Sequence, residues 1–359
     1  MRHRILVTEG TSGAKPGMSQ HAADRGASLS DLRGWLRRAG KHISVEDLQH
    51  VGPLGVWNII AGFSKAPDRL NDWTFDLDAR DTDFVELVTD AARAIGKTWF
   101  RYSVRGIEHV PSEGPVLLVG NHNGGIMPID TFLTLTALWD RFGPGRAVNP
   151  LGHDLLAFDP VGRRLSAKLG ILRASEAAAS AALRDGRIVL VYPGSDMDSW
   201  RPWWHRDKVH FAERKGFVRL ALREDVPIVP VVSVGTHEQL IVLSRGRFIA
   251  RRLGLQKRLR TTAFPIVWAL PWGLTSGYLP YLPLPAQTTL AFGSPLRWRD
   301  RTSSDADRPA VVDACYDEVV ASMQALLTLL VRRRVPWLGD PARLVPRVLR
   351  DWVRGAGVE

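Results

Sequence analysis

The fold is decided by one stretch of the chain, Val116-Leu-Leu-Val-Gly-Asn-His-Asn-Gly-Gly-Ile-Met-Pro-Ile-Asp130. It begins with a short apolar run of the kind that forms a buried strand. Glycines then break the run around His122, and Pro128 suits the first turn of a helix. The stretch therefore predicts a strand over residues 116–119, a turn that carries the histidine, and a helix from Ile129 to Trp139.

The same alternation of apolar runs and helical patterns continues on both sides of this stretch. Strands are predicted at residues 188–192, 228–234 and 288–292, and helices at 29–38, 83–100, 216–223, 311–334 and 344–353. Alternation of this kind is typical of an α/β fold. We therefore predict an α/β protein with a mixed central sheet flanked by helices and with helical additions at both ends.

The chain divides by its composition into four parts. Residues 1–27 are polar, lack the apolar core of a signal peptide and are predicted to be a disordered leader. Residues 28–84 are predicted to form an N-terminal helical segment, residues 85–300 the α/β domain, and residues 301–359 a C-terminal basic helical region.

Composition and charge exclude several classes of protein. Of 359 residues, 45% are hydrophobic and 24% charged, which is ordinary for a folded protein and unlike a disordered chain. The net charge of +11 favours an anionic partner. A single cysteine, Cys315, cannot form an internal disulfide, which fits a reducing cytoplasm. No zinc-type cysteine spacing, His-Glu-x-x-His or Gly-x-Ser-x-Gly pattern occurs, so we predict no metal and no serine hydrolase.

One long stretch indicates contact with a membrane. Residues 261–296 contain no charge but six prolines, which forbid a straight spanning helix. A basic run precedes them, made of Arg245, Arg247, Arg251, Arg252, Lys257, Arg258 and Arg260. Basic residues beside an apolar stretch with Trp268 and Trp272 are typical of a peripheral or monotopic protein at the cytoplasmic face of a membrane. A solvated helix followed by a buried loop is the alternative.

The turn at His122 predicts acid–base chemistry. Catalytic groups of α/β proteins lie beyond the carboxyl ends of the strands, where this histidine is expected. Asp130 would lie near the start of the next helix and could fold back onto the imidazole, fixing its tautomer so that the other nitrogen accepts a proton. Alternatively, Asp130 is a charge at a helix N-terminus and His122 a buried turn residue.

Four blocks in order give the chain a wider resemblance. They are Asn121-His122 with Asp130, Gly170-Ile-Leu-Arg173, Val191-Tyr-Pro-Gly194 and Val226-Pro-Ile-Val-Pro-Val231. Together they resemble the glycerolipid acyltransferase family, which includes 1-acylglycerol-3-phosphate O-acyltransferases. The resemblance implies transfer of a fatty acyl group from acyl-CoA or acyl carrier protein to a lipid hydroxyl, without a covalent enzyme intermediate and without a further cofactor.

The same resemblance assigns roles to particular residues. It makes His122 the catalytic base and Asp130 its orienting partner. The predicted substrate-binding residues are Asn121, Gly124, Gly125, Arg173, Pro193, Gly194 and Ser195, together with Lys215, which could hold an anion at the start of a helix or simply begin that helix. Arg173 could serve an acceptor phosphate, the phosphates of CoA or a surface ion pair.

Two departures from the family pattern leave the acceptor open. The aspartate usually follows the histidine by five positions, where this chain has Met127. The third block usually reads Pro-Glu-Gly-Thr, and here Asp196 would repel a phosphate unless a cation intervened. A phosphorylated acceptor such as lysophosphatidic acid remains the first expectation. A neutral acceptor such as diacylglycerol is the second, and related neutral-lipid enzymes also carry Pro-Gly in this block.

Two further readings of the sequence come from other classes of protein. An inactive lipid-binding protein could keep the fold without the activity. The mixed aromatic and basic segment 200–208 could stack on an adenine, lie at a lipid interface or bind single-stranded nucleic acid. We expect no nucleic acid, because no recognition fold accompanies the segment, and the sequence does not predict an oligomeric state.

Overall fold

The computed structural model describes residues 29–44, 47, 75–123, 125–153, 160–259 and 261–341. The chain forms two compact units, residues 1–42 and residues 43–359. The described part of the first unit is α1 (Leu29–His42), which confirms the helix predicted there. The proposed leader, the helix predicted at 344–353 and Gly124 lie outside the described residues.

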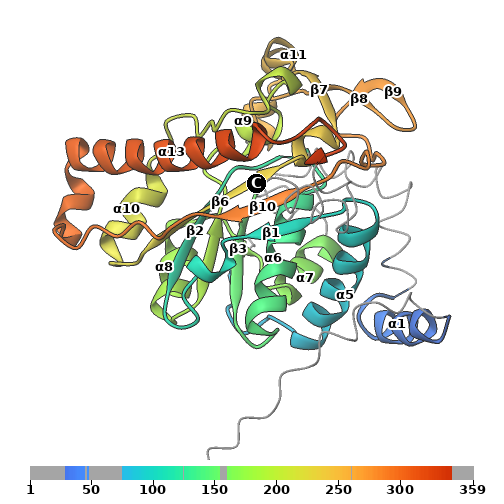
Figure 1. The fold of residues 1–359 in the computed structure, drawn as a ribbon, viewed down its shortest axis with the longest axis horizontal. Coiled ribbons are helices and arrows are strands. Elements are labelled where there is room, and N and C mark those ends of the chain that lie inside the picture. The colour runs from blue at the N-terminus through green and yellow to red at the C-terminus, as the bar shows by residue number, and fades with distance from the viewer. Residues whose placement is uncertain are drawn as a thin grey trace, which may run out of the picture. The chain divides into compact units, whose positions relative to one another are not determined.

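A seven-stranded sheet is the centre of the second unit, with the order β1-β10-β6-β2-β5-β3-β4 (Figure 1). Its strands are β1 (Ser103–Arg105), β2 (Val116–Gly120), β3 (Val148–Gly152), β4 (Leu172–Arg173), β5 (Ile188–Val191), β6 (Ile228–Val234) and β10 (Thr289–Phe292). Strands β6, β2, β5, β3 and β4 are parallel, whereas β10 is antiparallel to β6. The sheet is therefore mixed, as predicted.

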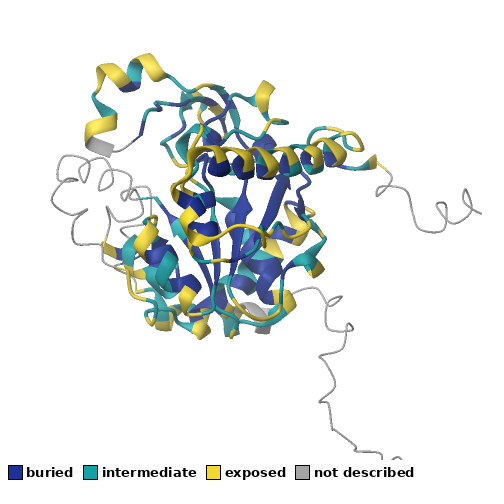
Figure 2. Ribbon diagram, turned by 90° about the vertical axis from the view of Figure 1, so that its left-hand side faces the viewer, coloured by how far each residue is buried: buried dark blue, intermediate teal, exposed yellow. Residues whose placement is uncertain are grey.

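Helices cover both faces of this sheet. They include α5 (Thr82–Thr98), α6 (Ile129–Phe142), α7 (Pro160–Lys168), α8 (Glu176–Arg184), α10 (Gly216–Arg223) and α13 (Pro309–Val331). The shorter helices α9 (Asp196–Ser199), α11 (Arg247–Arg252) and α12 (Leu255–Leu259) lie outside these two layers (Figure 1). The largest core cluster joins α8, α10 and α13 to one face, and a smaller cluster joins α6 to the other. Figure 2 shows the strands as the most buried layer.

The central strands are buried because both of their faces are covered. All residues of β2 and β6 are buried, and their sequences are nearly continuous apolar runs, which is typical of parallel strands between two helical layers. At one end of the core, Asp81 accepts a hydrogen bond from the Phe84 amide (3.1 Å) and caps α5. This helix begins at Thr82, three residues before the domain boundary predicted at residue 85.

The charge-free stretch, residues 261–296, contains β-strands that were not predicted because prolines interrupt it. Within residues 261–296 lie β8 (Ile266–Ala269) and β9 (Gly273–Ser276), which pair with each other and, through β8, with β7 (Ile241–Ser244). The stretch ends in β10, the strand predicted there. The stretch therefore contributes two strands to a small antiparallel sheet and then β10, the second strand from one edge of the central sheet.

One helix in the described part of the chain, α13, has the length and apolar composition of a membrane-crossing helix. It lies across one face of the central sheet, and Val319, Met323 and Leu327 are among the residues it buries there (Figure 1). A core helix of this kind meets the same criteria of length and composition. The region predicted as a basic C-terminal addition thus begins with a helix that completes the core.

Candidate active site

The predicted contact between His122 and Asp130 is present. His122 lies two residues beyond β2, and Asp130 lies in the first turn of α6. The imidazole Nδ1 is 3.0 Å from Asp130 Oδ2, which also accepts a hydrogen bond from the Asn123 amide (2.7 Å). The other carboxylate oxygen accepts from the Thr131 amide (2.7 Å). Asp130 is thus held on both oxygens and fixes the orientation of the ring.

The charges around His122 favour a proton on its ring. Burial alone would lower the pKa of His122, but the carboxylates of Asp130 and Asp198 outweigh it and raise that pKa above its ordinary value. Because Asp130 accepts at Nδ1, that nitrogen carries the hydrogen and Nε2 is left as an acceptor. Nε2 makes no hydrogen bond to the described residues, and 18% of the side chain is exposed. The ring is therefore arranged to accept a proton from solvent or substrate.

Tyr192, from the third sequence block, packs against the same ring. The ring centroids of Tyr192 and His122 are 4.5 Å apart, with 25° between the planes. Gly120 makes room for this contact, since a Cβ there would lie 2.4 Å from the tyrosine ring. Burial raises the pKa of the Tyr192 hydroxyl well above its ordinary value, so the ring stays neutral.

A second buried carboxylate, Asp198, was missed by the sequence analysis. Asp198 Oδ2 accepts a hydrogen bond from the His122 amide (2.6 Å), and its other oxygen is paired with Arg201. Arg201 also donates to Asn123 Oδ1 (2.9 Å), so one ion pair braces both sides of the histidine turn. Burial raises the pKa of Asp198, although Arg201 and the His122 amide oppose that rise. The only sequence signal was two opposite charges three residues apart, a common spacing.

Arg201 and two of the three tryptophans in residues 200–208 pack against other parts of the protein. Trp200 lies in the core of the small sheet, and Trp203 stacks on Trp337 with 5.6 Å between ring centroids. The Arg206 guanidinium also lies over the Trp203 ring, with its Cζ 3.8 Å from the ring centroid. Trp200 and Trp203 are thus engaged by the protein itself, whereas Trp204 is 58% exposed, so contact of this segment with a lipid interface stays a prediction.

Several predicted substrate-binding residues prove to shape the turns of the site. Asn121 donates to the Ser233 carbonyl (3.0 Å) and accepts from the Ser233 amide (2.8 Å), so it fastens the histidine turn to β6. Gly125 has a φ of 66°, and a Cβ there would lie 2.7 Å from Trp200. Contact of Asn121 and Gly125 with substrate stays a prediction. In the structure, both residues stabilise the turn that carries His122.

The turn after β5 contains Pro193, Gly194 and Ser195. A Cβ on Gly194 would lie 2.3 Å from the Asp198 Cβ, so only glycine lets the chain turn tightly enough to place that carboxylate. Ser195 has a φ of 47° with a ψ of −132°, a sparsely populated backbone conformation that costs a residue with a side chain about 1–3 kcal/mol. Strain of this kind is common at functional sites, where the surroundings hold it in place.

Arg173 and Lys215 differ in how well the structure fits their predicted roles. Arg173 pairs with Gly152 at the end of β4, on the same edge of the sheet as His122 but three strands away, roughly 14 Å. Lys215 is 2.9 Å from Asp313 on α13 and 3.6 Å from Glu213. The Lys215 side chain is therefore paired with two carboxylates and joins the start of α10 to α13, which favours the alternative of a simple helix start over an anion-binding role.

Asp196, which was expected to repel a phosphate, is already neutralised. It accepts hydrogen bonds from Arg214 (3.1 Å) and the Thr262 amide (3.0 Å). Burial would raise the pKa of Asp196, but these two partners outweigh it and lower that pKa. The carboxylate therefore ties the start of the charge-free stretch to α9 instead of facing an acceptor.

Further cations lie beside this pair, outside the sequence blocks. Arg247 Nη2 is 3.7 Å from Met197 Sδ on α9. Burial, followed by repulsion from Arg247 and Arg201, lowers the pKa of Arg245, while Asp198 and Asp196 oppose that change. The Nε of Arg245 is buried without a hydrogen-bond partner in the described structure. We call the following four side chains the site cations: Arg201, Arg214, Arg245 and Arg247.

Comparison with known proteins places this geometry in a class. The family model described as Acyltransferase matches residues 101–234, which run from just before β1 to the end of β6 and include the whole His122 site. An uncharacterised protein of Mycobacterium tuberculosis is 32% identical over 254 residues, 70% of this chain and 68% of that protein. One from Mycobacterium leprae is 30% identical over 335 residues, covering 87% of this chain and 88% of its own. The chain belongs to the acyltransferase family and is an acyltransferase enzyme.

Two further similarities are more distant. The "DGAT1/2-independent enzyme synthesizing storage lipids" of Gallus gallus is 26% identical over 180 residues, 49% of this chain and 50% of that protein. The crystal structure of the 1-acyl-sn-glycerophosphate (LPA) acyltransferase PlsC from Thermotoga maritima matches with 16% identity and a TM-score of 0.39, over 81% of this chain and 97% of that one.

Proposed function

We propose that this enzyme transfers a fatty acyl group from a thioester, acyl-CoA or acyl carrier protein, to the hydroxyl of a glycerolipid. The observation that carries the proposal is the His122 imidazole, held at Nδ1 by Asp130 and open at Nε2. Such a group accepts the proton of an attacking hydroxyl, a step typically worth 10²–10⁴-fold in rate.

The reaction follows from this arrangement. The acceptor hydroxyl gives its proton to His122 Nε2 while its oxygen attacks the thioester carbonyl carbon. The tetrahedral intermediate then collapses, the carbon–sulfur bond breaks, and the imidazolium returns the proton to the leaving thiolate. Asp130 keeps its contact with Nδ1 and stabilises the imidazolium, so the new ester forms without a covalent enzyme intermediate.

A phosphorylated acceptor such as lysophosphatidic acid is favoured by the charges beside His122. Four site cations lie beside only two carboxylates, Asp196 and Asp198. The excess comes from the half-buried Arg245 and the exposed Arg247, because Arg201 and Arg214 are paired with the two carboxylates. A doubly negative group would balance these two charges, and the arginine fork matches phosphate oxygens. The acceptor phosphate would bind at this excess charge.

A neutral acceptor such as diacylglycerol is the second candidate. The charge-free residues 261–296 adjoin the site through Thr262, and they could deliver an uncharged lipid from a bilayer. The similarity to proteins named as enzymes synthesizing storage lipids also favours it.

We further propose that the enzyme works as a peripheral or monotopic protein at the cytoplasmic face of a membrane. The small sheet exposes Trp268, Trp272 and Leu274, and α11 exposes Phe248. Arg251 and Arg252 are exposed on the same helix as Phe248. Exposed apolar rings beside arginines can insert among lipid chains while the charges meet anionic headgroups.

An acyl-transfer assay tests the function. Purified enzyme would be given labelled acyl-CoA or acyl carrier protein with lysophosphatidic acid, other lysophospholipids, glycerol-3-phosphate or diacylglycerol. We expect a labelled ester product that disappears in His122→Ala, whereas His205→Ala, a matched histidine change outside the dyad, keeps the activity. Lipid binding without any transfer would instead support the inactive lipid-binding protein, and full activity of His122→Ala would overturn the mechanism.

A further inference from the structure

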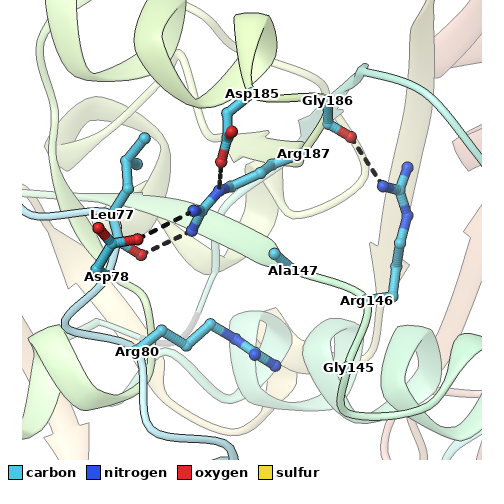
Figure 3. Close-up of a pocket in the computed structure, with 9 residues that line it drawn as sticks. All are labelled: Leu77, Asp78, Arg80, Gly145, Arg146, Ala147, Asp185, Gly186 and Arg187. Carbon is cyan, nitrogen blue, oxygen red and sulfur yellow. Dashed lines mark hydrogen bonds and ion pairs between the residues drawn. The ribbon is translucent and has the colours of Figure 1, made fainter.

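A cavity of about 410 Å³ lies at the amino ends of β3 and β5, whereas His122 lies beyond the carboxyl end of β2. Figure 3 shows the residues that line this cavity. Its walls come from three chain segments, around Arg80, Arg146 and Arg187, the last two just before β3 and β5. From Arg187 to Tyr192 the chain advances five residues along β5, about 16 Å at the rise of a strand. The cavity is therefore separate from the catalytic site.

Three arginines face this cavity and bind backbone carbonyls around it. Arg187 Nη1 donates to the Leu77 carbonyl (2.7 Å), and Arg146 Nη1 donates to the Gly186 carbonyl (2.8 Å). Arg80 donates to the Pro144 carbonyl. Arg146 also donates from Nη2 to the Gly114 carbonyl. Arg80 and Arg146 still keep an unused donor, because their Nε atoms are buried without a hydrogen-bond partner among the described residues, whereas the Nε of Arg187 is bound to Asp185.

The two carboxylates that line the cavity form ion pairs with only one of these arginines, Arg187. Asp185 lies 2.5 Å and Asp78 3.8 Å from Arg187, and the Asp78 side chain is 97% exposed. Figure 3 shows Arg187 between these two aspartates, with Arg80 and Arg146 on the other sides of the space. In the described structure neither Arg80 nor Arg146 forms an ion pair. Burial and then repulsion from Arg187 lower the pKa of Arg80, as expected for a cation without a counterion.

We propose that this cavity binds a phosphate or pyrophosphate group, with Arg80 and Arg146 as its main ligands. Guanidinium groups with unused donors form short, charge-assisted bonds to phosphate oxygens. The volume lies within the range of small-molecule sites and exceeds that of a single phosphate, so the group belongs to a larger molecule. That molecule is either a free phosphorylated metabolite or the headgroup of an anionic lipid.

Gly145 provides a matched pair of variants for the test. It lines the cavity, and a Cβ added there meets no atom within 4 Å. Gly145→Asp places a negative charge in the cavity, whereas Gly145→Asn adds a side chain of the same size without the charge. Arg80→Gln is a second, independent variant that keeps an amide donor for the Pro144 carbonyl. Circular dichroism and thermal unfolding would show that each protein is folded.

Calorimetric titration of the full chain with inorganic pyrophosphate is the first arm. We expect saturable binding to the wild type and to Gly145→Asn, and binding weaker by about tenfold or more in Gly145→Asp and Arg80→Gln, as for the loss of a charged hydrogen bond. Arg245→Gln alters the site cations, which could bind pyrophosphate as well, so the difference between Gly145→Asn and Gly145→Asp should persist when both are combined with Arg245→Gln. Pyrophosphate binding that is equal in Gly145→Asp and Gly145→Asn would overturn the proposal.

Vesicles that contain phosphatidic acid form the second arm and distinguish the two sources of the phosphate. Weaker vesicle binding by Gly145→Asp than by Gly145→Asn, without pyrophosphate binding, assigns the cavity to a lipid headgroup. Pyrophosphate binding with equal vesicle binding assigns it to a free metabolite. If neither probe distinguishes the two variants, the arginines only cap backbone carbonyls and the proposal fails.

Discussion

The acid side of the pH–rate profile should report the protonation of His122. A general base must be neutral, and Asp130 and Asp198 raise the pKa of His122 despite its burial, so kcat/KM should begin to fall at a pH above the ordinary value of 6.5. Asp130→Asn removes one of these charges. We expect it to lower the rate and to move this limb to lower pH, measured as kcat/KM against pH. A limb that stays in place would assign the titration to another group.

A second buried histidine, His237, should make the protein sensitive to acid. Its Nε2 donates to the Arg201 carbonyl (2.5 Å), and burial followed by repulsion from Arg201 lowers the pKa of His237 to about 3. Below pH 6.5, His237 therefore binds a proton in the unfolded chain but stays neutral in the folded chain. The free energy of unfolding should fall between about pH 6.5 and pH 3, by an amount on the order of 4 kcal/mol.

His237→Gln gives the control, because glutamine can donate the same hydrogen bond without titrating. Urea unfolding at a series of pH values should show a smaller loss of stability in this variant than in the wild type. Parallel curves for the two proteins would show that other groups cause the acid sensitivity.

The role of a site residue could be predicted from the sequence where a local motif marks it. It could not be predicted where the role depends on a partner far away in the sequence. The His122–Asp130 contact followed from a glycine-rich turn before a helix. Asp198 lies 76 positions from the amide it binds, so nothing near it in the sequence marks that role. Lys215 looked like an anion ligand because its partner Asp313 is almost a hundred residues away.

At the scale of elements, the segment from β7 into α11 should determine the affinity for a phosphorylated acceptor. Arg245→Gln removes one of the site cations, and the loss of a charged hydrogen bond should raise the KM for lysophosphatidic acid by about tenfold or more. The KM for diacylglycerol should not change. Lys257→Gln on α12 is the control from the same basic run. Equal effects of both variants, or on both acceptors, would argue against a phosphate site here.

Regular elements were predictable where one pattern dominated. The helices α5, α6, α10 and α13 and the strands β2, β5, β6 and β10 were predicted nearly to their ends. The strands β7, β8 and β9 were missed because prolines and exposed tryptophans hide the alternation of β8 and β9. β4 was missed because it has two residues, too few for any period.

For the whole molecule, the net charge of +11 predicts binding to anionic membranes that weakens with salt. The wild type should float with anionic vesicles at low salt and less at high salt. Arg251→Gln combined with Arg252→Gln should bind more weakly than the matched pair Arg299→Gln with Arg301→Gln. Equal flotation with neutral and anionic vesicles would show that the basic run is simply a solvated surface.

The mixed sheet was predictable as a class, but its strand order was not. Alternating strands and helices indicate parallel pairing, and this accounts for β2, β5 and β6. The position of β10 beside β6, antiparallel to it, depends on how the chain returns from the small sheet. That path is set by contacts such as Asp196 with Thr262, which no local pattern contains.

The loop between His122 and Asp130 has a consequence for finding and redesigning such enzymes. The aspartate stands eight positions after the histidine in this chain, yet its oxygen still lies 3.0 Å from the ring nitrogen. Loop length is thus a free variable, provided that the two ends still meet. A search pattern with a fixed gap would pass over this protein, whereas a search by interatomic distance would find it. Within this loop, designers could vary the exposed Ile126 without parting the dyad, whereas Asn123 and Gly125 hold the turn.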